Sequence, residues 1–501
     1  MKICYFAFDS IGSVFTPLLL DDAIIHAQDL NCEVQFVYCD AFLPACGINY
    51  FKSNLLCKEC VVNRELLIGK YRDVKNLKFI ALSSIVKQDI DISDGNFDFE
   101  NIKEIKDICY KGINIGLGVV SSFVSKTRNL DAEINEVSRT VFENLLKSAC
   151  LIIEATLNLD KENNFDEIRL CNGRLITERA VFETAKFLKK EIKVLELSNS
   201  SIAHTFKKVC YNNALPHDIT NTTLLIEEMW EKEKFGSRKA KEFYENRKNG
   251  RYASQQIFTQ NQEKGRLPDG WAADKRNFVI FNSSEDEFFA IGGQWDEYKI
   301  FNNQLDGICY LAESASNDKS IHFYLRIHPN LKEIKYKYVT DITNRLKRFD
   351  NITVISGDSP VSTYTLIDYA EKCIVFGSSV GVEANYWGKP VILLGGAMYS
   401  KLDVAYYPSS LKDLDFLLLK YLEPKSKTGA LKFGLYVFGE RGDDFKYIDF
   451  SFTSYKVFNK TFILNNYLSH GNAIIRMFYR LLRFIPIIIS YKRNKKLYLE
   501  N

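Results

Sequence analysis

The stretch that decides the fold is Cys373-Ile-Val-Phe-Gly-Ser-Ser-Val-Gly-Val-Glu-Ala-Asn-Tyr-Trp-Gly-Lys-Pro-Val-Ile-Leu-Leu394. The apolar run from Cys373 to Phe376 ends at a glycine, which predicts a buried parallel strand. Residues 380–387 have helical character, and Gly388 predicts the end of that helix. Val391 to Leu394 then reads as the next buried strand. The order strand, tight turn, helix, strand indicates a parallel α/β sheet with crossover helices.

The Gly-Ser-Ser turn between the strand and the helix suggests a binding site. The first turn of a helix carries backbone N–H groups without helical partners and a partial positive charge, and the hydroxyls of Ser378 and Ser379 add donors. Such a turn favours a phosphate or carboxylate. Glu383, one helical turn further on, is placed to accept hydrogen bonds from a ribose diol. The alternative is a serine that caps an ordinary crossover helix, and the turn alone does not distinguish the two.

Two further apolar runs lead into polar residues. The segments Phe278–Glu287 and Phe323–Asn330 both read as short parallel strands followed by a polar loop. Because the carboxyl ends of parallel strands meet at one edge of a sheet, we expect the three strand ends to converge on one crevice. The donor-binding residues predicted there, besides Glu383 and the turn residues Gly377, Ser378 and Ser379, are Ser283, Ser284, Glu285, Arg326, His328 and Pro329.

Together these motifs resemble the nucleotide-sugar half of a GT-B glycosyltransferase. More narrowly, they resemble the capsule and surface polysaccharide biosynthesis family, which includes enzymes that use CMP-activated Kdo. The His-Pro and Ser-Ser pairs are also similar to those of bacterial sialyltransferases, in which both hold the CMP phosphate or ribose. The resemblance covers roughly residues 276–400 and is weaker in the N-terminal half. The residues that carry it are Ser283–Glu287, Arg326–Pro329, Gly377–Ala384 and Gly388–Pro390.

The resemblance implies an α/β fold of GT-B architecture, with two Rossmann-like domains facing each other across a cleft. It implies that Arg326, His328 and the serine turn stabilise the negative charge on the departing nucleotide phosphate without a metal. The predicted segments are an N-terminal acceptor domain (1–218), an interdomain connection (219–275), a nucleotide-sugar domain (276–425) and a C-terminal extension with a basic amphipathic helical tail (426–501).

The composition is that of a globular protein with room for two or three domains. The chain has 501 residues, of which 46% are hydrophobic and 26% charged, and its net charge of +3 gives no support to nucleic-acid binding. Its 12 cysteines are scattered, which favours buried thiols in a reducing cytosol. We find neither a signal peptide nor an uncharged apolar run long enough to span a membrane, so we expect a cytoplasmic protein.

The N-terminal half begins like a Rossmann unit, with a predicted strand from Lys2 to Phe8 followed by a loop and a helix. No G-x-G-x-x-G motif is present there, so we expect no nicotinamide and no other cofactor. In a GT-B protein this loop faces the cleft, where a base must take the acceptor proton. The candidate catalytic residues are Asp9 and His26, with Asp21 and Asp22 nearby, and His328 at the donor phosphate. The alternative for the N-terminal four is solvated acids at a helix start and a packed histidine.

An Asn-Gly-Arg sequence follows the predicted strand that starts at Glu167. Since it comes at the carboxyl end of a parallel strand, we predict that Asn172, Arg174 and Arg179 lie in the cleft and contact the donor phosphate or an acidic acceptor. The alternative is a turn with solvated arginines.

Three cysteines have a spacing that resembles part of a zinc site. Cys46, Cys57 and Cys60 would supply three thiolate ligands, but no fourth ligand is evident. The alternative is a cysteine-rich structural loop, and we expect no metal in catalysis.

The C-terminal part of the chain differs in character. Residues 472–501 contain seven basic residues and one acid, and Arg476, Arg480 and Arg483 recur at helical spacing. Such a segment favours peripheral contact with an anionic membrane, and the alternative is a terminal helix packed across both domains. The aromatic alternation within 430–453 predicts a hairpin or a pair of irregular strands.

These observations predict a glycosyltransferase that moves a sugar from a nucleotide-activated donor, CMP-Kdo-like or another, to a surface polysaccharide or its lipid-linked acceptor. Its expected partners are a nucleotide sugar, a glycan or glycolipid, and the inner face of the cytoplasmic membrane. The alternatives are a glycerophosphate-type transferase or UDP-sugar epimerase on the same fold, and a membrane-associated assembly protein without activity. An epimerase would not need the basic tail, and the intact Arg326, His328 and Glu383 argue against an inactive protein.

Overall fold

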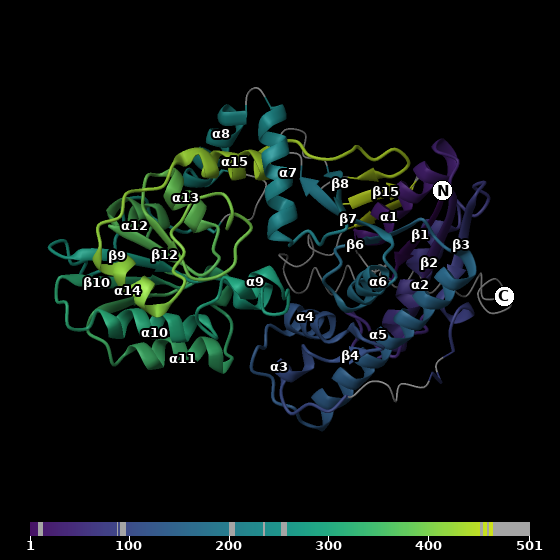
Figure 1. The fold of residues 1–501 in the computed structure, drawn as a ribbon, viewed down its shortest axis with the longest axis horizontal. Coiled ribbons are helices and arrows are strands. Elements are labelled where there is room, and N and C mark those ends of the chain that lie inside the picture. Colours follow the sequence, from purple (N-terminus) through teal and green to yellow (C-terminus); the bar gives the residue numbers. More distant parts are fainter. Residues whose placement is uncertain are drawn as a thin grey trace. The chain divides into compact units, whose positions relative to one another are not determined.

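The computed structural model describes residues 1–8, 14–87, 89–90, 97–199, 206–233, 236–251, 258–450, 454–457 and 460–463. These residues form two compact α/β units (Figure 1). The first comprises Met1–Ser122, Glu133–Pro216 and the described residues after Glu440, and the second comprises Phe123–Ala132 and His217–Glu440. Each unit is built on a mainly parallel sheet, so the prediction of two Rossmann-like domains is confirmed.

The first unit has a six-stranded sheet in the order β3-β2-β1-β6-β7-β8. The strands are parallel except for β8, which is antiparallel to β7. Every residue of β1 after the exposed Lys2 is buried, as expected for a central strand covered on both faces. The strands are β1 (Lys2–Ala7), β2 (Glu33–Tyr38), β3 (Leu77–Ala81), β6 (Glu167–Cys171), β7 (Glu191–Asn199) and β8 (Phe206–Asn212).

Helices connect these strands, and their ends follow local sequence signals. The long helix α5 begins at a capping box formed by Asn135 and Ser138 and ends at Asn164, which has a left-handed conformation (φ 49°). The remaining elements are α1 (Phe15–Ile24), which continues as the π-helix η1 (Ile25–Asp29), α2 (Asn54–Ile68), η2 (Leu82–Ser84), α3 (Ile102–Ile105), β4 (Cys109–Tyr110), β5 (Ile113–Asn114), α4 (Gly116–Thr127), α5 (Glu136–Asn163) and α6 (Ile176–Phe187).

The second unit has a five-stranded parallel sheet in the order β11-β10-β9-β12-β13. After β9 the chain adds β10 and β11 on one side of it and then β12 and β13 on its other side, so the strand order reverses beside β9. Ligands bind outside the carboxyl ends of the strands at such a reversal. The strands are β9 (Arg276–Phe281), β10 (Ile321–Arg326), β11 (Ile352–Ile355), β12 (Lys372–Val375) and β13 (Val391–Leu393).

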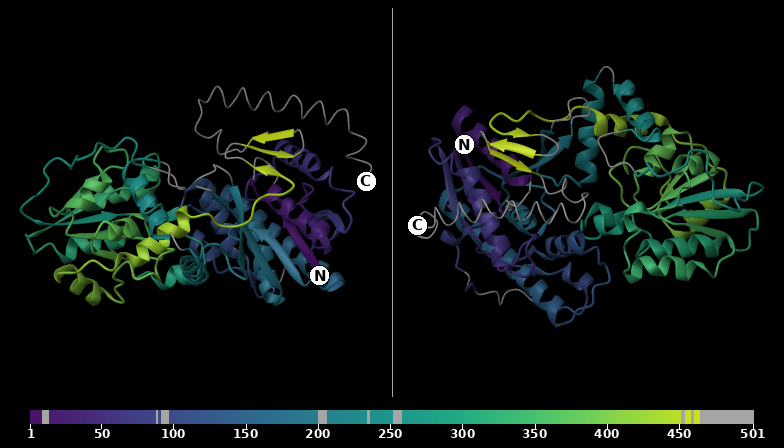
Figure 2. Two further views of the ribbon diagram at one scale, coloured as in Figure 1. Left: turned by 90° about the horizontal axis from the view of Figure 1, so that it is seen from above. Right: turned by 180° about the vertical axis from the view of Figure 1, so that it is seen from behind.

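Apolar residues of this sheet alternate between two cores. Phe278 and Ile280 pack with α10, α11 and α14 on one face, while Val279 and Phe281 pack with α12, α13 and α15 on the other. Figure 2 shows helices on both faces of this sheet. The helical elements are α7 (Ile219–Lys232), α8 (Gly236–Lys248), η3 (Glu285–Glu287), α9 (Gln294–Glu297), α10 (Gln304–Ser314), η4 (Pro329–Leu331), α11 (Lys337–Leu346), α12 (Thr363–Tyr369), α13 (Val380–Tyr386), α14 (Leu411–Leu419) and α15 (Lys427–Phe438).

The deciding stretch forms β12, α13 and β13, as predicted. Gly377 has φ +95°, and a Cβ there would lie 2.6 Å from the carbonyl oxygen of Gly396, so only glycine fits this turn. Gly388 has φ +80° and follows the last turn of α13 as a helix stop.

The prediction of strands throughout 430–453 is wrong. Its first part lies in α15, which packs against α7, α8 and α13. Because α15 is buried on most sides, its residues are apolar nearly throughout, and the alternation does not report a strand. Strands begin only at β14 (Asp449–Phe450), which pairs with β15 (Ser454–Val457), followed by β16 (Lys460–Ile463).

The segment expected to connect the domains, 219–275, belongs to the second unit. Its helices α7 and α8 both pack on α15. The basic tail, 472–501, lies outside the described residues. Among the helices of the described residues, none is both long enough and apolar enough to cross a lipid bilayer.

Candidate functional site

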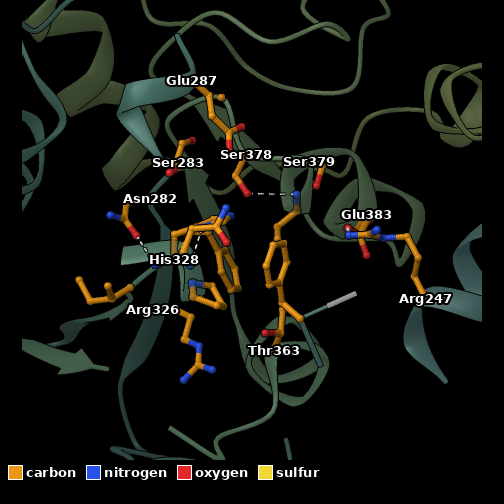
Figure 3. Close-up of a pocket in the computed structure, with 18 of the residues that line it drawn as sticks. Arg247, Asn282, Ser283, Glu287, Arg326, His328, Thr363, Ser378, Ser379 and Glu383 are labelled. Carbon is orange, nitrogen blue, oxygen red and sulfur yellow. Dashed lines mark hydrogen bonds and ion pairs between the residues drawn. The ribbon is translucent and has the colours of Figure 1, made fainter. Parts of the chain in front are cut away.

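A cavity of about 380 Å³ lies in the second unit at the carboxyl ends of β9, β10 and β12 (Figure 3). The loops after these three strands all line it, so the structure brings the predicted strand ends together. Among the residues predicted to bind the donor, those in the cavity wall are Ser283, Ser284, Arg326, His328, Pro329, Gly377, Ser378, Ser379 and Glu383. The wall includes Glu287 rather than the predicted Glu285, although both belong to η3.

The serines at the end of β9 use their hydroxyl protons within the protein. Ser283 Oγ donates to the carbonyl of Phe376 at 2.7 Å, which joins the end of β9 to the end of β12. Ser284 Oγ donates to the buried carboxylate of Asp286. Toward a ligand, both serine hydroxyls can therefore accept hydrogen bonds but not donate them.

Arg326, at the end of β10, is a buried cation bonded only to neutral groups in the described part of the chain. It is 4% exposed, and Nη1 and Nη2 donate to the carbonyls of Ser356 and Ser359 at 2.9 and 3.0 Å. Its Nε has no hydrogen-bond partner among the described residues. Burial lowers the Arg326 pKa to about 10, and Asp358 acts in the opposite direction. Buried arginines are usually paired with carboxylates, so this guanidinium can accept an anionic ligand.

His328 is a neutral hydrogen-bond donor toward the cavity. Its Nδ1 accepts a hydrogen bond from the backbone N–H of Asn330 at 3.2 Å, which places the ring proton on Nε2. Burial lowers the pKa of His328 to about 4. The Asp286 carboxylate acts in the opposite direction, and the Arg128 cation lowers this pKa as burial does. At neutral pH the imidazole therefore donates through Nε2–H without a positive charge.

The Gly-Ser-Ser turn leads into α13, which has seven residues. The Oγ of Ser378 accepts a hydrogen bond from the Val380 N–H at 3.3 Å, and its carbonyl accepts from the Tyr399 hydroxyl and from the Gly381 N–H. These contacts fix the turn. The Ser379 side chain makes no cap hydrogen bond to α13 and lies at the cavity (Figure 3).

Glu383, expected to bind ribose, is held by two protein groups. It is 3% exposed and accepts a hydrogen bond from the Tyr364 hydroxyl. Its Oε1 lies 2.9 Å from Nη2 of Arg247, a residue of α8 that also lines the cavity. This contact is an ion pair between two buried side chains. Burial lowers the Arg247 pKa, but Glu383 and Tyr364 together raise it by more, and the net shift is upward.

Arg247 and Tyr364 are site residues that the sequence analysis missed. Arg247 lies in a heavily charged helical segment taken as an interdomain connection. No spacing rule links it to Glu383, because their contact depends on how α8 packs. The one available signal is an arginine in the last turn of a helix, three and four residues after the buried Tyr244 and Phe243 and therefore on the same helix face.

In the first unit, Asn172, Arg174 and Arg179 surround the start of α6. Asn172 (φ 58°) accepts a hydrogen bond from the Arg174 N–H at 3.1 Å and donates through Nδ2 to Glu196 Oε1 at 2.9 Å. Arg179 is buried, and its Nε donates to Glu183 at 2.7 Å. This is a structured turn with a paired arginine, and contact with a donor or acceptor stays a prediction.

Of the candidate bases, Asp9 lies outside the described residues. His26 is 8% exposed, and its Nδ1 lies 3.0 Å from the Tyr5 hydroxyl and 2.9 Å from the Asp22 carbonyl. The Asp22 carboxylate is paired with Arg169 at 2.6 Å. These contacts are those of packed side chains, the alternative that the sequence left open, and a catalytic role for His26 stays a prediction.

Asp21 has a structural role instead of the catalytic role considered for it. Its side chain is fully buried and pairs with Lys208. It also accepts hydrogen bonds from three consecutive backbone N–H groups, those of Lys446, Tyr447 and Ile448. Asp21 therefore anchors the segment that begins at Lys446 to α1 of the first unit.

The zinc alternative is not supported. Within the described residues, no group of three histidine, cysteine, aspartate or glutamate side chains could hold a metal ion, and Cys46, Cys57 and Cys60 are part of that set. Asn49 Nδ2 donates to the Cys57 sulfur at 3.2 Å, as in a structural loop.

Comparison with known proteins shows what the second unit is similar to. Residues 213–407 match the family model described as capsule polysaccharide biosynthesis protein. A search of curated proteins finds no match. Among solved structures, the chain is similar to the β-Kdo 2,4 transferase KpsC of Thermosulfurimonas dismutans, with 14% identity, a TM-score of 0.35 and coverage of 62% of this chain and 87% of that one.

Two other solved structures are similar over a larger share of the chain. One is the UDP-GlcNAc 2-epimerase of Neisseria meningitidis bound to UDP-GlcNAc, with 11% identity, a TM-score of 0.22 and coverage of 88% and 96%. The other is the glycosyltransferase SsfS6 of Streptomyces sp. SF2575 complexed with thymidine diphosphate, with 10% identity, a TM-score of 0.22 and coverage of 88% and 97%. Over residues 213–407, which contain every predicted donor-binding residue, the resemblance to capsule polysaccharide biosynthesis proteins is confirmed.

Proposed function

We propose that this protein is a glycosyltransferase that transfers a sugar from a nucleotide-activated donor to a capsule or related surface polysaccharide, or to its lipid-linked acceptor. The observation that carries the proposal is Arg326, a buried guanidinium without a carboxylate partner in the described structure, at the wall of the cavity. A nucleotide phosphate would supply the missing anion. The family match supports the polysaccharide context, and a CMP-Kdo-like donor is the form that the motif resemblance favours.

The cavity provides what departure of a nucleotide requires. When the bond between the anomeric carbon and the phosphate oxygen breaks, negative charge grows on that oxygen. Arg326, the Nε2–H of His328 and the hydroxyl of Ser379 can stabilise this charge, and all three line the cavity. Because the protein's own donors serve this role, the proposed reaction is metal-independent. Contact of the basic tail with the inner face of the cytoplasmic membrane, where a lipid-linked acceptor would lie, is also part of the proposal.

The test is a thermal-shift experiment on the purified chain with CMP, CDP, UDP and GDP. A ligand that binds only the folded state raises the melting temperature. We expect a rise with one nucleotide that is lost in His328→Ala. His322→Ala is the matched control, because His322 lies on β10, the strand that leads to His328, but is not among the residues of the cavity wall. If none of the nucleotides raises the melting temperature of the wild type, the proposal is wrong.

A further inference from the structure

The phosphate site proposed above does not use a second arginine of the cavity. Arg247 comes from the last turn of α8, and its side chain is 12% exposed. Its Nε and Nη1 have no hydrogen-bond partner among the described residues. Leaving buried donors unsatisfied costs free energy, so a group that accepts a hydrogen bond from Arg247 would stabilise the arrangement.

The charge around Arg247 differs from the charge around Arg326. The Glu383 carboxylate lies 2.9 Å from Arg247 Nη2 and neutralises it within the buried wall. A phosphate at Arg247 would also meet the negative charge of Glu383, which disfavours it. Arg247 therefore suits an uncharged acceptor, whereas Arg326 suits an anion.

The two arginines also lie apart in the cavity. Figure 3 shows Arg247 and Glu383 together on one side and His328 and Arg326 toward the other. The wall includes Tyr364, whose hydroxyl is bonded to Glu383, and Phe433. Flat aromatic groups favour a nucleobase as a neighbour. Cytosine, uracil and guanine carry carbonyl oxygens that an arginine can bind, whereas adenine carries none.

We propose that Arg247 recognises the nucleobase of the donor by donating a hydrogen bond to a base carbonyl oxygen, and that Glu383 and Tyr364 position it. This inference rests on the proposed function, since it requires a nucleotide in the cavity. It changes the role expected for Glu383. Because Arg247 and Tyr364 already engage its two oxygens, Glu383 is a positioning residue rather than a ribose ligand.

The test measures dissociation constants by calorimetry for CMP, UMP, GMP, AMP and ribose 5-phosphate. In Arg247→Gln, the preference of the wild type for its best carbonyl-bearing nucleotide over AMP should fall by about 10- to 100-fold. Affinity for ribose 5-phosphate should stay unchanged. His328→Ala should weaken all five ligands alike. Arg266→Gln is the matched control, because Arg266 is 44% exposed and paired with Glu263.

The outcomes separate this inference from the proposed function. Equal weakening of all ligands in Arg247→Gln, ribose 5-phosphate included, would place Arg247 at the sugar or phosphate and overturn the inference. Unchanged affinities would overturn it as well. If the wild type binds no nucleotide, the proposed function itself fails. If Arg247→Gln does not fold because Glu383 is left unpaired, the experiment uses the double variant Arg247→Gln with Glu383→Gln, which removes both charges. Tyr364→Phe should lower the same preference by a smaller factor.

Discussion

Replacing Glu196 with glutamine should change how the stability of the first unit depends on pH. Glu196 lies on β7 beside the loop after β6, where it accepts a hydrogen bond from Asn172. Burial raises the pKa of Glu196 to about 7, although Asn172, the Leu197 N–H and Arg174 act in the opposite direction. The carboxyl group therefore loses its proton near neutral pH instead of in acid.

The direction of the effect follows from proton linkage. The folded-state pKa, about 7, lies above the ordinary value of 4.5. Between these pH values the folded protein holds a proton that the unfolded chain has lost, so this stabilisation is fully present below about pH 4.5 and lost as the pH rises through about 7. A shift of about 2.5 units corresponds to about 3 kcal/mol. This is an upper limit, because the Glu196 side chain keeps some contact with water.

Glutamine at this position cannot titrate, so the variant should not lose stability in this way as the pH rises. From about pH 5 to 8, the melting temperature of Glu196→Gln should rise relative to the wild type by up to about 6–12 °C, at roughly 2–4 °C per kcal/mol. Differential scanning calorimetry of the first unit's transition measures this difference. Glu33→Gln, at an exposed position on β2, is the control and should show no such trend. A constant difference between Glu196→Gln and the wild type over this range would refute the reasoning.

Three further predictions concern other buried ionisable groups. Asp21→Asn should lower the free energy of unfolding by about 3–5 kcal/mol, because it leaves the buried Lys208 without its counter-charge; denaturant titration should also show partial recovery in the double variant with Lys208→Met. Lys372 is 0% exposed, and its Nζ donates to three carbonyls at the end of α14. In the same assay Lys372→Met should lower the free energy of unfolding by about 3 kcal/mol, and a decrease below about 1 kcal/mol would contradict this role. In ¹⁵N-resolved NMR, His328 should show the Nε2–H tautomer and no titration between about pH 5.5 and 8, because its pKa is lowered to about 4; a midpoint near 6.5 would contradict the buried environment.

The parts of the fold that could be predicted from sequence depend on local signals. Residues 373–394 contain a strand, a turn that requires glycine at 377, a helix and a helix stop, and each signal lies within a few residues of the feature it specifies. The position of the cavity could be predicted because the carboxyl ends of parallel strands share one edge, whatever the details of packing.

The contacts that give the site its chemistry are long-range, and the sequence does not show them. Glu383 is in the predicted helix, but its partners come from α8 and α12, so its role could not be inferred from its position one turn after the serines. The direction of the Ser283 hydroxyl depends on the carbonyl of Phe376, a residue of another strand end. The helix α15 was missed because it is apolar on most sides, which removes the amphipathic period.

The two arginines of the cavity make different demands on a ligand. Arg326 donates its hydrogen bonds to neutral carbonyls, and of the described carboxylates Asp358 offsets the burial of its charge in part. Arg247 has its counter-charge in Glu383 and lacks only hydrogen-bond acceptors. A ligand that satisfies both must be anionic at one end and neutral, with an exposed carbonyl, at the other. A nucleoside phosphate has this distribution, whereas inorganic phosphate satisfies only Arg326, and a free base or nucleoside satisfies only Arg247. On the proposed assignment, binding of the whole nucleotide should therefore be much tighter than binding of either part.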